Sequence, residues 1–99
     1  MLPYIFTENA MADVVKQAMY YDDKEKGLGI RFMDEITLAA EEISKMPKAF
    51  ASSYKSTRER KTKHFPYKLI YTLEEGIIYI HAVYGCKANP KNKYKRIKK

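Results

Sequence analysis

The sequence predicts an α+β domain that spans residues 1–99, with an N-terminal strand and an antiparallel helical hairpin packed on a small, mainly antiparallel sheet. Three observations lead to this prediction. A chain of 99 residues is long enough for one core and too short for two. Apolar residues recur every three or four positions before Pro47 and in strand-like runs after it. Turn residues separate these segments, which gives the order β-α-α-β-β-β followed by a short C-terminal helix or tail.

The first two elements are a strand and a helix. Leu2 to Phe6 is a short apolar run, and Pro3 near its start suggests an edge position. Thr7 or Asn9 can cap the helix that follows. This helix should end between residues 22 and 26, with Gly27 as its terminator. Its expected buried face consists of Met11, Val14, Val15, Ala18 and Tyr21.

The second helix should lie antiparallel to the first, because only a few residues around Gly27-Leu28-Gly29 separate them. This corner lacks the preceding strand and further glycines of a phosphate-binding loop, so we interpret it as a junction between helices. Pro47 ends the second helix. Its apolar positions are Phe32, Ile36, Ala39, Ala40, Ile43 and Met46.

Three strands are expected in the second half, after a polar loop over residues 50–56. The first is Thr57 to His64, with Arg58, Arg60, Thr62 and His64 on one side. Tyr67 to Leu73 and Ile77 to Tyr84 follow, joined by a hairpin turn at residues 74–76. The last strand is apolar on both faces, which predicts a central position. The helices should cover one face of the sheet. The other face should stay open and gather Arg58, Arg60, Lys68 and the C-terminal tail.

Charge is divided unevenly along the chain. Residues 1–47 hold five lysines and arginines and nine acids, a net charge of −4, whereas residues 48–99 hold fourteen and three, a net charge of +11. The stretch from Lys87 to Lys99 has seven basic residues and no acid. The second half should therefore attract a polyanion or an acidic protein segment.

Several features bear on location and on metal binding. Cys86 is the only cysteine, and the N-terminus lacks the cationic start and long apolar stretch of a signal peptide. No apolar run approaches the roughly 18 residues of a membrane span. These features favour the cytoplasm.

We interpret His64 as a surface histidine and His81 as a packed or hydrogen-bonded one. No residues have metal-ligand spacing, so neither a metal nor a cofactor is expected.

Five segments occur in order along nearly the whole chain: YYDDKEKGLGIRFMDEI (Tyr20 to Ile36), MPKAF (Met46 to Phe50), FPYKLIY (Phe65 to Tyr71), IYIHAV (Ile78 to Val83) and NPK (Asn89 to Lys91). Together they resemble the RelE/ParE superfamily of type II toxin–antitoxin toxins. The resemblance implies a helical hairpin on a small antiparallel sheet. It also implies a toxin, in systems linked to plasmid stabilization, that forms a hetero-oligomer with a cognate antitoxin. From the charge of residues 48–99, the C-terminal segment of that antitoxin is expected to be acidic and amphipathic.

The superfamily contains two activities. ParE-like members poison DNA gyrase by binding, and RelE-like members cut mRNA on the ribosome. The GLGxxF corner (Gly27 to Phe32) and FPY (Phe65 to Tyr67) are more similar to the ParE side. The favoured hypothesis is therefore a gyrase inhibitor without catalysis. The alternatives are a ribosome-dependent mRNA endonuclease and an inactive toxin-like remnant.

The resemblance and the charge together nominate site residues. RNA cleavage needs a base, an acid and cations around the phosphate. The candidates for such a site are Arg58, Arg60, Lys68, Tyr84, Lys87 and Tyr94. The candidates for target binding are Arg58, Arg60, Lys68, Lys87, Lys91, Tyr94, Lys95 and Arg96.

Two departures from the family pattern bear on activity: the first weakens the case for catalysis, and the second supports the alternative of an inactive remnant. Lys68 stands where ribonuclease members have an arginine, and lysine lacks the bidentate fork of a guanidinium. Relatives often have His, Arg and Trp where this chain has Gly85, Ala88 and Lys93.

Overall fold

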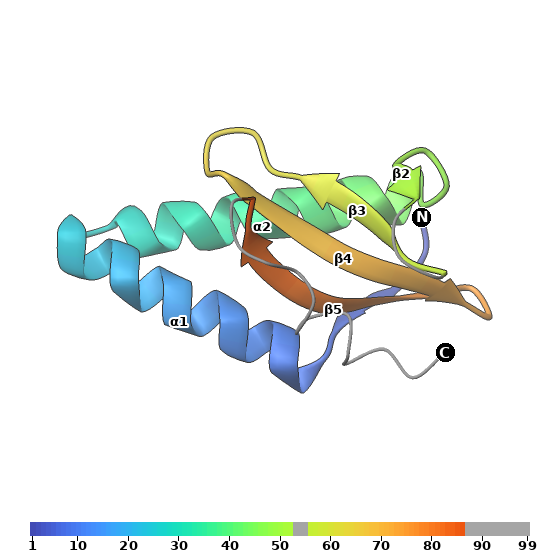
Figure 1. The fold of residues 1–99 in the computed structure, drawn as a ribbon, viewed down its shortest axis with the longest axis horizontal. Coiled ribbons are helices and arrows are strands. Elements are labelled where there is room, and N and C mark those ends of the chain that lie inside the picture. Colours follow the sequence, from blue (N-terminus) through green and yellow to red (C-terminus); the bar gives the residue numbers. More distant parts are fainter. Residues whose placement is uncertain (53–55, 87–99) are drawn as a thin grey trace.

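The computed structural model describes residues 1–52 and 56–86. In chain order the elements are β1 (Tyr4–Phe6), α1 (Glu8–Lys24), α2 (Leu28–Lys45), β2 (Ala51–Ser52), β3 (Arg58–Lys61), β4 (Tyr67–Glu74) and β5 (Ile77–Gly85). The strands form one sheet in the order β1-β5-β4-β3-β2, in which β1 is parallel to β5 and the other pairs are antiparallel. Figure 1 shows the two helices as an antiparallel hairpin packed beside the sheet. The α+β prediction is therefore confirmed, with β1 at an edge and β5 in the interior of the sheet.

The start of α1 follows the sequence prediction, but its buried face does not. Thr7 caps the helix, because its Oγ1 accepts a hydrogen bond from the Ala10 amide at 3.3 Å. The buried positions are Ala10, Val14 and Ala18, whereas Met11 and Val15 are 45% and 47% exposed. The prediction that Met11 and Val15 are buried was wrong. Ala10 and Ala18 are small, so α1 can approach its neighbours closely at these positions. A search for large apolar residues at helical spacing does not identify such small buried residues.

Close contact between the helices depends on Gly29. A Cβ atom added at Gly29 would lie 2.4 Å from the carbonyl oxygen of Ala18. Asp22 of α1 holds the same corner, because its Oδ1 accepts hydrogen bonds from the amides of Gly27 and Gly29, both at 3.0 Å. Gly27 has φ of 90°, which favours glycine, but it is the N-cap of α2 and not the terminator of α1, whose C-cap is Glu25. The predicted junction is confirmed, and a side chain of α1 caps α2.

The helix-covered face of the sheet carries the main core. Leu69, Tyr71, Ile80 and Val83 of β4 and β5 lie there, together with the buried residues of α2. All the predicted apolar positions of α2 are buried except Met46, which is 57% exposed just beyond the helix. This core fixes the relative positions of the two helices, β4 and β5.

The other face of the sheet is not simply open. Ile70, Ala82 and Tyr84 form a second buried cluster there, with exposed fractions of 0%, 0% and 4%. The expectation of an uncovered second face was therefore wrong at this part of the sheet. The expected loop at residues 50–56 also contains the short strand β2, which pairs with β3. Two residues are too short a segment for a hydrophobic period to reveal.

Candidate functional site

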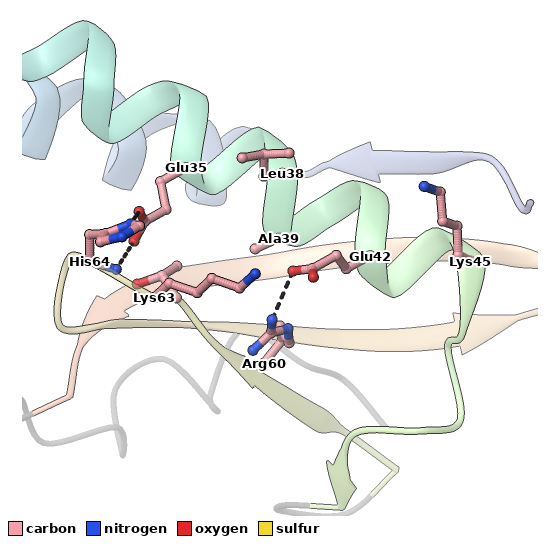
Figure 2. A pocket seen from close by; sticks show the side chains of 9 residues that line it. Glu35, Leu38, Ala39, Glu42, Lys45, Arg60, Lys63 and His64 are labelled. Carbon is pink, nitrogen blue, oxygen red and sulfur yellow. Dashed lines mark hydrogen bonds and ion pairs between the residues drawn. The ribbon is translucent and has the colours of Figure 1, made fainter.

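A groove of about 260 Å³ has α2 as one wall, and β3 together with the loop that follows it as the other wall. Figure 2 shows Glu35 directed toward His64 and Glu42 directed toward Arg60, with Lys63 extending between the two pairs. The helix contributes two carboxylates, one lysine and an apolar strip, and the opposite wall contributes the cations. The lining residues are Glu35, Leu38, Ala39, Glu42, Lys45, Arg60, Thr62, Lys63 and His64.

Arg60 joins the two walls of this groove. Its Nη2 forms an ion pair with Glu42 Oε1 of α2 at 2.7 Å, and its guanidinium lies 4.9 Å from the centre of the Phe50 ring. The side chain is only 18% exposed, and its Nε is buried without a hydrogen-bond partner among the described residues. An arginine held in this way is part of the scaffold that fixes β3 against α2.

Arg58 fixes the segment that follows α2. Its Nη1 donates a hydrogen bond to the Phe50 carbonyl at 2.7 Å. Its cross-strand neighbour Tyr71 donates from its hydroxyl to the Pro47 carbonyl at 2.6 Å. Burial raises the pKa of Tyr71, and the charge of Arg58 opposes that shift. Both side chains therefore hold residues 47–50 against the sheet.

Lys68 lies on the opposite face of the sheet from Arg58 and Arg60. It pairs across the strands with Lys61, and directly opposed residues share a face. Its Nζ forms an ion pair with Glu59 Oε1 at 3.3 Å, and the hydroxyl of Tyr84 donates to Glu59 Oε2 at 3.1 Å. The prediction that Arg58, Arg60 and Lys68 gather on one open face was wrong. Alternation within β3 was read correctly, but the sequence does not reveal which side the helices cover.

Glu35 holds the loop between β3 and β4. Its Oε2 accepts hydrogen bonds from the amides of His64 at 2.6 Å and Phe65 at 2.9 Å, and its Oε1 lies 2.7 Å from His64 Nδ1. Burial raises the pKa of this carboxyl group, but the hydrogen bonds outweigh burial and hold the pKa below its ordinary value. The His64 side chain is 82% exposed, which confirms the prediction of a surface histidine.

Sequence reasoning missed both Glu35 and Glu42. They are seven residues apart on α2, and the spacing of two helical turns places them on one side of a helix. That spacing was the available signal, although it could not identify their partners in β3 and the following loop.

Some of the remaining predicted residues lie in the described part of the chain, and the others lie outside it. His81 is hydrogen-bonded as expected, because its Nε2 lies 2.9 Å from Thr72 Oγ1. Gly85 is the last residue of β5. Outside the described residues lie Lys87, Ala88, Lys91, Lys93, Tyr94, Lys95 and Arg96.

Two kinds of feature are absent from residues 1–52 and 56–86. These ranges contain no group of three His, Cys, Asp or Glu side chains placed to bind a metal ion. No helix in these ranges has the length and apolar character needed to cross a membrane.

The α2–β3 groove combines an apolar wall, at the 60% exposed Leu38, with the exposed lysines Lys45 and Lys63. This combination suits an extended or helical segment that carries carboxylates beside apolar anchors.

Comparisons with known proteins agree with this fold. The family model described as ParE toxin of type II toxin–antitoxin system, parDE, matches residues 4–89. Among solved structures, the chain is similar to one from the chromosomal ParDE toxin–antitoxin system of P. aeruginosa, with a TM-score of 0.77 and 15% identity. The similarity covers 86% of this chain and 96% of that chain, and at this identity it supports the fold alone. No curated protein sequence matches the chain.

Proposed function

Because the chain belongs to the ParE toxin family of type II toxin–antitoxin systems, we propose that it poisons DNA gyrase by binding and that a cognate antitoxin neutralises it. The proposed setting is the cytoplasm, where gyrase acts on DNA. The toxin binds its antitoxin as a hetero-oligomer until the antitoxin is removed. Neither step requires a metal or a cofactor.

The separation of the three candidate cations supports binding over RNA cleavage. Arg60 is paired with Glu42, Arg58 is bonded to the Phe50 carbonyl, and Lys68 is paired with Glu59 on the opposite face. A phosphorane-like transition state is stabilised by cations that converge on one point. Cations that are engaged on two faces of a sheet do not converge. This is the single observation that carries the choice between the two activities.

Contacts with gyrase are proposed for Lys68 and the cationic residues beyond β5. Lys68 lies on the face away from the helices and is partly exposed. The other proposed contacts are Lys87, Lys91, Tyr94, Lys95 and Arg96, chosen for their charge and aromatic character. Arg58 and Arg60 no longer belong in this set, because their guanidinium groups bind the Phe50 carbonyl and Glu42 of α2.

The α2–β3 groove is the proposed seat of the antitoxin's acidic segment. Apolar anchors would lie along Leu38, and carboxylates would meet Lys45 and Lys63 at the rim. Apolar burial would supply most of the affinity, whereas the charges would mainly speed association. This placement replaces the sequence-based expectation that Arg58 and Arg60 receive the carboxylates.

Two assays with the full chain test the proposed target. Purified toxin should inhibit supercoiling by gyrase and should leave mRNA uncut on translating ribosomes. Premixing with the product of the neighbouring reading frame, tested as the antitoxin, should restore supercoiling. Codon-positioned mRNA cuts together with normal gyrase activity would replace this proposal with ribosome-dependent RNA cleavage.

Association kinetics test the proposed groove. The double variant Lys45→Glu/Lys63→Glu should slow association with the antitoxin by about tenfold or more at low salt, and the difference should shrink as salt screens the charges. Lys16→Glu/Lys26→Glu makes the same change in net charge on the helical hairpin outside the groove. If both variants slowed association equally, the effect would be one of overall charge, and the groove would be the wrong site.

A further inference from the structure

The outer surface of the helical hairpin carries an unusual set of exposed apolar side chains. Met11, Val15 and Met19 of α1 are 45%, 47% and 65% exposed, and Ile30 and Met33 of α2 are 66% and 41% exposed. We refer to these five residues as the outer stripe. Three of the five methionines in the chain belong to it. Single exposed apolar residues are common, but a contiguous group of them marks an interaction surface.

The outer stripe is continuous across both helices. Met11, Val15 and Met19 follow each other at intervals of four residues, so they lie along one side of α1. Met19, Ile30 and Met33 together line a depression of about 210 Å³, at the point where Gly29 lets the helices approach. The stripe therefore consists of this depression and of Val15 and Met11, which continue from it along α1; we refer to the depression and this row together as the channel.

Carboxylates border this channel. Glu8 precedes Met11 by three residues, Asp22 and Asp23 follow Met19 by three and four, and Asp34 follows Ile30 by four, so each shares a side of its helix with the stripe. All four residues are exposed. Two cations have the same spacing, since Lys16 precedes Met19 by three residues and Lys26 precedes Ile30 by four, against four carboxylates. Residues 1–47 as a whole carry a net charge of −4, opposite in sign to the rest of the chain.

We propose that the outer stripe binds a basic amphipathic helix of a partner protein. The apolar face of that helix lies on the methionines, whose flexible thioether side chains adapt to different shapes. Its lysines or arginines meet the bordering carboxylates. An acidic segment is disfavoured here, because it would bring like charges together along the whole channel.

The outer stripe and the α2–β3 groove lie on different sides of α2. Ile30 and Met33 line the depression beside α1, whereas Glu35 and Glu42 point toward β3 and the loop after it. An acidic segment in the groove and a basic helix on the stripe can therefore bind together. This inference does not depend on which enzyme the toxin inhibits.

Two synthetic peptides test the proposal directly. One is an amphipathic helix of about 14 residues, roughly four turns, with leucines on one face and lysines on the other. The matched peptide carries glutamate in place of each lysine. The measurement is a titration of the full chain labelled at its methionine methyl groups. The lysine peptide should shift Met11, Met19 and Met33 and leave Met46 unmoved. It should bind at least about tenfold more tightly than the glutamate peptide, although the whole chain is positively charged.

Variants separate the stripe from other surfaces. Met19→Lys/Met33→Lys should weaken binding of the lysine peptide by about tenfold or more, because it adds charge to exposed positions of the channel. Leu38→Lys, at a position that is 60% exposed on the groove side of α2, should leave binding unchanged. Circular dichroism of each variant checks that the fold is retained.

Three results would overturn the proposal. The first is equal binding of the two peptides, and the second is no binding of the lysine peptide. The third is protection of the Met11, Met19 and Met33 methyl groups by the acidic antitoxin segment alone, which would assign the stripe to the antitoxin.

Discussion

Replacing Gly29 by alanine should destabilise the protein, although the same change stabilises most helices. Alanine in a helix interior is favoured over glycine by roughly 0.5–1 kcal/mol. Here the new Cβ would lie 2.4 Å from the Ala18 carbonyl oxygen and 3.1 Å from Asp22 Oδ1. Both helices would have to move apart, and overpacking of this kind costs about 1–3 kcal/mol. Weakening the Asp22 cap costs about a further 1 kcal/mol. The net expectation is a loss of about 1–3 kcal/mol.

Urea unfolding followed by circular dichroism measures this loss. In a domain of this size, 1 kcal/mol corresponds to a fall in Tm of about 4–8 °C. Gly27→Ala is the matched control, because nothing lies within 4 Å of its added Cβ and its cost arises from φ of 90° alone. That control should lose about 1–2 kcal/mol. Ala18→Gly should not rescue Gly29→Ala, because the clash is with a carbonyl oxygen and not with a side chain. A Gly29→Ala protein as stable as the wild type would refute the reasoning.

Three further predictions concern the groove, the core and the tail. Glu35→Gln should cost about 1–2 kcal/mol at pH 7, measured by urea unfolding. Because folding lowers the pKa of Glu35, this stabilisation is present above its ordinary pKa of 4.5 and disappears as the pH falls through the folded value, so the two proteins should converge in acid. Tyr71→Phe should cost about 1 kcal/mol, since it removes the hydrogen bond to Pro47. Tyr20→Phe at a 53% exposed position should cost almost nothing. Removing the residues after Asn89 should abolish growth inhibition in an induction assay while unfolding stays cooperative, and a non-cooperative transition would show that the tail is structural.

The sequence predicted most of the fold because its main elements carry strong local signals. The Thr7 cap, the helix junction at residues 27–29, the stop at Pro47 and the turn at residues 74–76 are local, and each lies where expected, although Gly27 caps α2 and the C-cap of α1 is Glu25. The buried face of α1 was misassigned because tight packing selected Ala10 and Ala18, whereas large residues such as Met11 and Val15 face outward. The helical period alone does not determine which of two neighbouring rows of side chains is buried.

The candidate site was less predictable, because it depends on pairing between distant segments. Arg58 and Arg60 were correctly placed on one side of a strand, but that side faces α2 and not solvent. Glu42 and Arg60 are eighteen residues apart, and Glu35 and Phe65 are thirty apart. No short motif encodes such pairs. Charge in a sequence therefore identified a basic half of the chain without separating cations that hold the fold from cations that meet a partner.

The parallel pairing of β1 with β5 has a consequence for folding during translation. Tyr4 lies opposite Ile78, and β1 has β5 as its only neighbour in the described sheet. β1 is translated before β5 and therefore cannot pair until β5 has left the ribosome. Closing so long a loop comes late in folding, since its entropy cost must be met before the contacts form. A chain interrupted before β5 lacks both the partner of β1 and the strand on which α1 packs. Native surfaces, and any toxicity that they carry, should thus arise only after β5 has been translated.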